Sequence, residues 1–107
     1  MVRSTHPEVL LIVRFKSSLR PDELEKRYKK RLPEFRALPG LVQKYYVHDP
    51  SSDEWGGFYL WDSQESLNEY MASDLRKSIP ETYQIAGTPR IETTTVIDIL
   101  RDRKSVV

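Results

Sequence analysis

The sequence predicts an α+β domain in which two helices cover one face of an antiparallel four-stranded sheet, in the chain order βαββαβ. Short apolar or β-branched runs alternate with two segments of helical periodicity. Two interleaved βα units of this kind form a ferredoxin-like sheet. The length of 107 residues suits one domain. We therefore predict a single domain over residues 1–107, with a core at about 9–100 and flexible ends at 1–8 and 101–107.

The first half of the chain contains a strand and a helix. Residues 9–16, "VLLIVRFK", are largely β-branched and apolar, as in a strand. The helix begins at Pro21, a residue favoured in the first helical turn. Its apolar face is marked at spacings of four, four and three residues by Leu24, Tyr28, Leu32 and Phe35. Pro33 falls inside this pattern and predicts a kink or break near residue 32.

The second half begins with a hairpin and ends with a strand. Residues 41–48 and 55–61 read as strands around the loop "DPSSDE". Asp62 with Glu65 resembles a capping box that opens a second helix, whose apolar stripe comprises Leu67, Tyr70 and Met71. A short turn over 73–83 stopped by Pro80, a loop at 86–89 and a last strand over 90–100 complete the prediction.

The first strand is apolar on both of its faces. Successive side chains of a strand point to opposite faces, so Leu11 and Val13 share one face while Leu10 and Ile12 share the other. Two helices cover only one face of the sheet. We therefore expect a homodimer in which a second copy covers the other face by sheet-on-sheet packing.

The hairpin contains the paired glycines of "WGGFYLW". If the loop is symmetric about residues 49–54, Tyr46 lies opposite Gly57 and Lys44 lies opposite Tyr59. One face then carries Lys44, Tyr46, His48, Trp55, Gly57, Tyr59 and Trp61. The gap that Gly57 leaves among large rings, beside a lysine, has the character of a small-molecule pocket. The alternative is that the glycines mark a β-bulge or a close approach of another segment.

Composition and motifs exclude several functions. The net charge is +1, from 17 basic and 16 acidic residues, so nothing favours nucleic-acid binding. There is no cysteine, His6 and His48 lie far apart, and no phosphate-binding glycine loop occurs, so we expect no metal and no cofactor. The apolar run at 9–13 is too short for a membrane span or a signal peptide. We expect a cytoplasmic protein that does not bind membranes.

The hairpin and the helix after it resemble a known family. The stretches "PGLVQKYYV" and "WGGFYLWDSQESLNEYM" are similar to the YdhR-like monooxygenases of the dimeric α/β-barrel, or antibiotic biosynthesis monooxygenase-like, superfamily. The predicted element order also fits this superfamily over residues 9–100. The resemblance implies a dimeric α/β barrel and monooxygenase activity, although the superfamily also holds isomerases, haem-handling proteins and plain binders.

The residues and the resemblance together give a leading hypothesis: a cofactor-independent monooxygenase acting on a small aromatic or polyphenolic substrate with O₂. Lys44 or Arg90 would stabilise a substrate anion. Tyr46 or Tyr59 would donate a hydrogen bond or relay a proton. The predicted site is Lys44 and Tyr59 as catalytic residues, with Tyr46, Trp55, Gly57, Trp61 and Arg90 binding the substrate. The alternatives are an isomerase or cyclase using the same anion-stabilising pocket and a non-catalytic dimeric small-molecule-binding protein.

Overall fold

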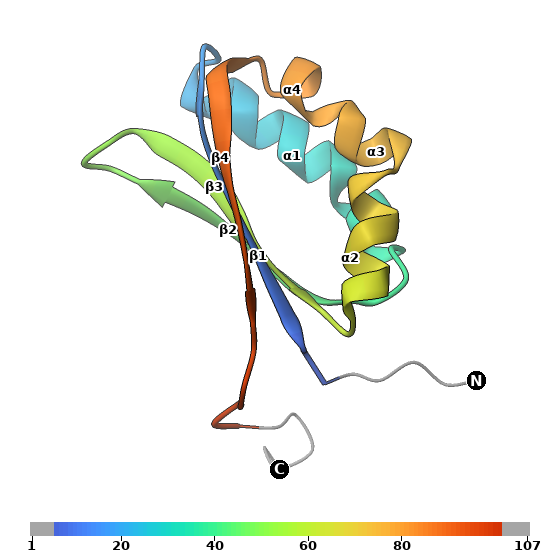
Figure 1. The fold of residues 1–107 in the computed structure, drawn as a ribbon. Helices are drawn as coiled ribbons and strands as arrows, with labels where there is room; N and C mark the ends of the chain where they lie inside the picture. Colours follow the sequence, from blue (N-terminus) through green and yellow to red (C-terminus); the bar gives the residue numbers. More distant parts are fainter. Residues whose placement is uncertain (1–5, 102–107) are drawn as a thin grey trace.

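The fold is a four-stranded antiparallel sheet with all its helices on one face (Figure 1). The computed structural model describes residues 6–101, so the expectations for 1–5 and 102–107 lie outside the described residues. The sheet order is β2-β3-β1-β4. This confirms the predicted ferredoxin-like architecture. The strands are β1 (Val9–Ser17), β2 (Leu41–Asp49), β3 (Glu54–Trp61) and β4 (Ile85–Thr95).

The core lies between the sheet and the helices, on what we call the helix face. The helices are α1 (Pro21–Arg36), α2 (Gln64–Met71), α3 (Asp74–Lys77) and α4 (Ile79–Thr82). None of the described helices is long and apolar enough to span a membrane. Leu11 of β1 and Trp61 of β3 are fully buried beneath the helices. The other buried apolar residues are Val9, Phe15, Leu24, Phe35, Tyr59, Leu67, Tyr70, Ile79 and Tyr83.

Helix α1 corrects the prediction of a break near residue 32, because it continues through Pro33 to Arg36. Pro33 removes the one helical hydrogen bond that its own amide would donate, and the helix continues around it. The carbonyl of Pro33 still accepts a hydrogen bond from the amide of Ala37. Phe35 is 3% exposed, so its burial holds the last turn against the sheet.

The start of α2 differs from the predicted capping box. The N-cap is Ser63, whose Oγ accepts a hydrogen bond from the amide of Ser66 at 3.1 Å. The Asp62 carboxylate instead accepts a hydrogen bond from the hydroxyl of Ser66 at 2.6 Å. The short turn predicted over 73–83 is two short helices. Pro80 lies in the first turn of α4 and does not stop it, since a proline there breaks no helical hydrogen bond.

Strand β4 begins earlier and ends earlier than the predicted 90–100. Residues 86–89, predicted as a loop, belong to the strand, which forms the edge of the sheet beside β1. The register between β1 and β4 shifts here, and Gly87 adopts φ 75°. An edge strand accommodates such an irregularity and a proline. The strand ends at Thr95 because its neighbour β1 begins at Val9, which pairs with Thr95.

The β2–β3 register confirms the predicted hairpin. His48 pairs with Trp55, Tyr46 with Gly57, and Lys44 with Tyr59. One irregularity interrupts this pairing: the register shifts between Leu41 and Gln43, so Leu41 pairs with Trp61. That irregularity moves Leu41 to the helix face, where it packs against the core.

The opposite face of the sheet, which we call the open face, is covered by none of the described helices (Figure 1). Alternation along the strands places Leu10 and Ile12 there, opposite Leu60 and Phe58. All four are partly buried, and their neighbour Tyr45 is 56% exposed. The open face is therefore an apolar surface at its centre.

Candidate functional site

The ammonium of Lys44 lies in a cage of three aromatic rings on the helix face. Its Nζ is 3.5 Å from the ring centre of Phe35, 4.2 Å from that of Tyr46 and 4.3 Å from that of Tyr59. Lys44 and Tyr46 come from β2, Tyr59 from β3 and Phe35 from the end of α1. Strand alternation and the register bring the first three side chains to the same face.

The charge of Lys44 has no balancing partner in the structure. Among residues 6–101, no hydrogen bond or ion pair to its Nζ is found. Burial, and after it the positive charge of Arg31, lower the pKa of Lys44 from 10.5 to about 7. The faces of the three rings favour the ammonium form and oppose this shift. Near neutral pH the side chain therefore exists both as an uncompensated cation and as a free amine.

Lys44 lies in the wall of a cavity of about 310 Å³ between the C-terminal half of α1 and β2. Pockets of this size accept a small organic molecule. A second cation, Arg36, also borders it. The remaining lining residues are Leu32, Phe35, Leu41, Val42, Gln43 and Tyr46. A planar ligand would meet aromatic and aliphatic walls with two positive charges.

A second cavity, of about 200 Å³, lies between the N-terminal half of α1 and the loop end of the β2–β3 hairpin. Tyr46 lines both cavities and stacks on Tyr28 with ring centres 4.7 Å apart. Trp55 lines this second cavity and packs on His48 at 4.1 Å between ring centres. The stacked pair of tyrosines thus stands at the junction of the two cavities.

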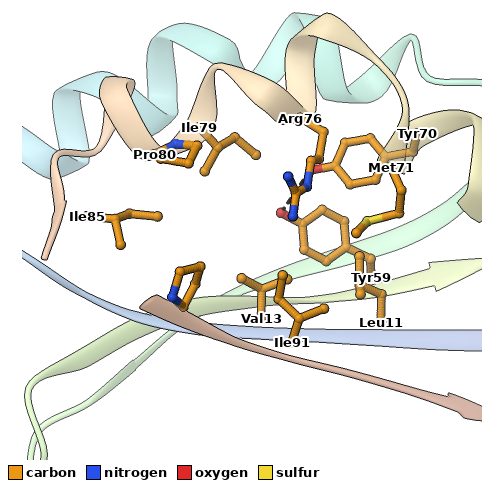
Figure 2. A pocket seen from close by; sticks show the side chains of 11 residues that line it. Leu11, Val13, Tyr59, Tyr70, Met71, Arg76, Ile79, Pro80, Ile85 and Ile91 are labelled. Atoms are coloured by element: carbon orange, nitrogen blue, oxygen red, sulfur yellow. Dashed lines mark hydrogen bonds between the residues drawn. The ribbon is translucent and has the colours of Figure 1, made fainter. Parts of the chain in front are cut away.

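A third cavity, of only about 30 Å³, lies beyond Tyr59, between the sheet and α2–α4 (Figure 2). The hydroxyl of Tyr70 donates to that of Tyr59 at 3.4 Å, and Arg76 points toward them. Burial raises the pKa of both tyrosines. Tyr59 therefore remains a protonated hydrogen-bond donor at neutral pH, with its ring between this cavity and Lys44.

Three buried donors have no hydrogen-bond partner in the described structure: the hydroxyls of Tyr46 and Tyr83 and the indole N–H of Trp61. Burial raises the pKa of Tyr83 to about 12, and it raises that of Tyr46 even further. Both hydroxyls stay protonated at neutral pH. Tyr46 and Tyr83 line the second cavity, so a ligand oxygen there could satisfy buried donors that otherwise destabilise the fold.

The structure brings together four predicted site residues, Lys44, Tyr46, Gly57 and Tyr59, but it corrects the role of the glycine. The space opposite Tyr46 is not an empty gap. A Cβ built on Gly57 would lie 2.9 Å from Cε1 of Tyr59 and 3.2 Å from Cε of Lys44. The two side chains occupy the space that the glycine leaves. Gly57 therefore admits the lysine to its cage, and the open cavity lies beside it.

The two tryptophans lie on either side of this group. Trp61 is fully buried, with its ring stacked on that of Tyr59 at 6.3 Å and 6°. It supports Tyr59 from behind and lines none of the three cavities. Trp55 lies toward the hairpin end and reaches only the second cavity.

Arg90 does not join the site. It pairs with Arg14 in the sheet and so belongs to the open face. Its Nη2 forms an ion pair with Oε1 of Glu54 at 2.9 Å, and its side chain is 59% exposed. The expectation that Arg90 stands beside Lys44 is corrected by the register of β4, which places the two cations on opposite faces.

Sequence reasoning missed the contribution of α1. Phe35 forms one wall of the cage and Arg36 borders the larger cavity. The spacing that marked Phe35 as a residue of the apolar helix face was the available signal. It could not show that the end of this helix lies over Lys44.

Metal binding finds no support in the described part of the chain. No group of three or more His, Cys, Asp or Glu side chains among residues 6–101 could hold a metal ion.

Comparisons with known proteins give a consistent assignment. Residues 10–93 match the family model described as "Putative mono-oxygenase ydhR". No curated protein matches the chain. Among solved structures, SnoaB from Streptomyces nogalater, a cofactor-independent oxygenase, is 17% identical with a TM-score of 0.71, over 91% of this chain and 100% of that one.

A second similar structure is a monooxygenase from the gene ActVA-Orf6 of Streptomyces coelicolor, solved with the ligand nanaomycin D. It is 16% identical with a TM-score of 0.66, over 90% of this chain and 93% of that one. At this identity the likeness confirms the fold of the antibiotic biosynthesis monooxygenase-like proteins and not their substrates.

Proposed function

The chain belongs to the YdhR family, and from this premise we propose that it is a cofactor-independent monooxygenase of a small aromatic or polyphenolic substrate. The family assignment supports an oxidoreductase. The likeness in fold to SnoaB, an oxygenase without a cofactor, supports the finer proposal. The ligand of the ActVA-Orf6 monooxygenase supports an aromatic substrate.

The observation that carries the proposal is the uncompensated Lys44 in the wall of a 310 Å³ cavity. A largely desolvated cation without a counter-ion favours an anionic ligand, because the ligand supplies the missing charge in surroundings of low dielectric constant. A phenolate fits both the ammonium and the aromatic walls. Binding next to the ammonium lowers the pKa of the substrate hydroxyl and raises the fraction of the anion.

The chemistry follows from the anion. A deprotonated hydroquinone or anthrone is electron-rich enough to reduce O₂ itself. In the anthrone case a ring CH₂ becomes a carbonyl: one oxygen atom enters the substrate, and the other leaves with the two hydrogens as water. The protein binds the anion, excludes bulk water and stabilises the negative charge as it moves to oxygen.

The other residues of the site take supporting roles. The protonated hydroxyl of Tyr46, which lines the 310 Å³ cavity, donates a hydrogen bond or a proton to the reacting oxygen. Tyr59 presents its ring to Lys44, and its hydroxyl, bonded to that of Tyr70, relays a proton. Trp55 stacks on the part of the substrate that reaches the second cavity. Trp61 holds the ring of Tyr59 in place. Arg36 is the second cation of the site, in the role first expected for Arg90.

We further propose that the protein is a homodimer joined by its open faces. Leu10, Ile12, Phe58 and Leu60 form an apolar surface that no described segment covers. The segment after β4 supports a second copy, because Ile97 and Leu100 are 96% and 94% exposed. Apolar side chains so exposed favour contact with another chain.

The experiment is oxygen uptake by chelator-treated, colourless protein with a panel of hydroquinones and anthrones, followed by mass spectrometry of products formed under ¹⁸O₂. The proposal expects uptake above the uncatalysed rate and one ¹⁸O atom in the product. Product formation that continues unchanged under strict anaerobiosis would overturn it in favour of an isomerase or cyclase. Tight binding with no reaction under either condition would indicate a binding protein.

A further inference from the structure

We propose that Lys44 is also a nucleophilic amine that forms an imine with an aromatic aldehyde or ketone bound in the 310 Å³ cavity. This adds a covalent carbonyl-binding activity to the site, and it depends neither on O₂ nor on the oxygenase proposal.

The geometry around Lys44 is that of a reactive lysine. Its amine is enclosed by the rings of Phe35, Tyr46 and Tyr59 and is bound to no carboxylate among residues 6–101. It is nevertheless only partly buried and lines a cavity, so a ligand can reach it. Lysines become nucleophiles when they are desolvated or lie near another cation.

Positive charges on the neighbouring helix α1 also favour the neutral amine of Lys44. Arg31 of α1 acts on Lys44 electrostatically, and Arg36 of the same helix borders the cavity. The titratable residues that face the amine from the sheet are Tyr46 and Tyr59, which present their rings to it and remain neutral at neutral pH. With a pKa of about 7, about half of the Lys44 side chains are neutral amines at pH 7. The neutral fraction of an ordinary lysine at this pH is about 1 in 2,500.

The reaction balances without an oxidant or reductant. The nitrogen lone pair attacks the carbonyl carbon, and the carbonyl oxygen takes up a proton to give a carbinolamine. Loss of the hydroxyl with a proton, as water, leaves the C=N bond. The hydroxyl of Tyr46, a protonated donor without a partner in the described structure, is suited to help the oxygen leave. The aromatic walls hold the ring of the carbonyl compound.

Other lysines serve as internal controls. Lys29 on α1 is exposed and forms an ion pair with Glu25 at 2.9 Å. This contact raises its pKa, in the opposite direction to that of Lys44. Carbonyl reagents should therefore discriminate between these two lysines of one protein.

The test is reductive trapping of wild-type protein at pH 7 with 2-naphthaldehyde and cyanoborohydride, read by intact mass and peptide mapping. Reduction converts an imine into a stable secondary amine. We expect a first adduct at Lys44 that forms at least about tenfold faster than any adduct at Lys29, because far more of its amine is neutral. Lys44→Arg should remove this adduct and leave slow modification elsewhere.

Two results would overturn the inference: adducts spread over exposed lysines with none at Lys44, or an equal rate at Lys44 and Lys29. The mapping is done on the folded wild-type chain, so it does not depend on the stability of a variant. The two proposals are tested independently. A failure of oxygen uptake would not affect the imine inference, and absence of the adduct would not affect the oxygenase proposal.

Discussion

The ammonium of Lys44 lies 3.5 Å from the ring centre of Phe35, although the two residues belong to different layers of the fold. Lys44 stands on an edge strand of the sheet, and Phe35 lies in the last turn of the helix above it. Phe35 excludes water from one side of the amine and so contributes to the desolvation that lowers the pKa of Lys44, while the face of its ring partly offsets that shift. The same contact places Lys44 at the end of α1 that borders the larger cavity.

The first prediction concerns pH and stability. The folded-state pKa of Lys44 is lowered from 10.5 to about 7, so between these values the unfolded chain binds more protons than the native one. Stability should therefore rise with pH from about 7 to 10.5, and the destabilisation from burying the charge should be greatest below pH 7. The contribution of Lys44 should have a slope of at most about 1.4 kcal/mol per pH unit, and the ring faces, which favour the ammonium form, narrow the pH range over which it applies.

Denaturant unfolding of wild type and Lys44→Met across pH 6–10 measures this slope as a difference between the two proteins. Lys44→Met should be the more stable protein at pH 6, with an advantage that shrinks as pH rises. A difference that is independent of pH would show that the lysine is not desolvated.

The second prediction separates the two glycines of the hairpin. In Gly57→Ala the new Cβ meets flexible side chains, Lys44 and Tyr59, which can shift. In Gly56→Ala it meets the backbone carbonyl oxygen of Val13 in the next strand, which cannot yield. We expect Gly57→Ala to lower stability by about 1 kcal/mol and Gly56→Ala by more, about 2–3 kcal/mol. Thermal melts of both variants show which one loses more stability. A larger loss in Gly57→Ala than in Gly56→Ala would contradict the packing described.

Much of the fold could be predicted from local signals. Strand alternation and a symmetric loop gave the pairing of Tyr46 with Gly57, which the structure confirms. The position of Arg90 could not be read in this way, because no tight turn joins β4 to its partner β1 and fixes their register, which pairs Arg90 with Arg14 on the open face. The gap beside Gly57 was misjudged because the sequence does not show which side chains fill a space. The aromatic cage could not be predicted, because one of its rings belongs to Phe35, whose position depends on how α1 lies across the sheet.

The third prediction tests the open-face dimer. Sedimentation of wild type at micromolar concentration should give about twice the chain mass of 12.6 kDa. Ile12 lies on the open face, so Ile12→Asp should shift the protein to monomer. Leu11, the neighbouring residue on the helix face, is fully buried beneath the helices, so Leu11→Asp should unfold the chain. A wild-type monomer, or an Ile12→Asp dimer as tight as wild type, would refute this interface.

The fourth prediction concerns the hydroxyl of Tyr59. Burial keeps it protonated, so it acts as a donor and not as a base. Tyr59→Phe should lower kcat by roughly 10²-fold if the hydroxyl donates a proton in the reaction. Tyr70→Phe removes the neighbouring hydroxyl, 3.4 Å away, and should have a smaller effect. If Tyr59→Phe is as active as wild type, the hydroxyl takes no part in the reaction and only the ring of Tyr59 contributes to the site.

The central claim is that Lys44 stabilises the substrate anion, and the most direct measurement is kcat for oxygen uptake by chelator-treated Lys44→Met. This variant keeps most of the side-chain bulk and removes the charge. The account predicts that kcat falls by roughly 10²-fold, about 2.7 kcal/mol, with a smaller loss of ligand affinity. The matched control Lys29→Met, at an exposed ion-paired lysine, should leave kcat unchanged. A Lys44→Met enzyme that consumes oxygen at the wild-type rate would contradict the account.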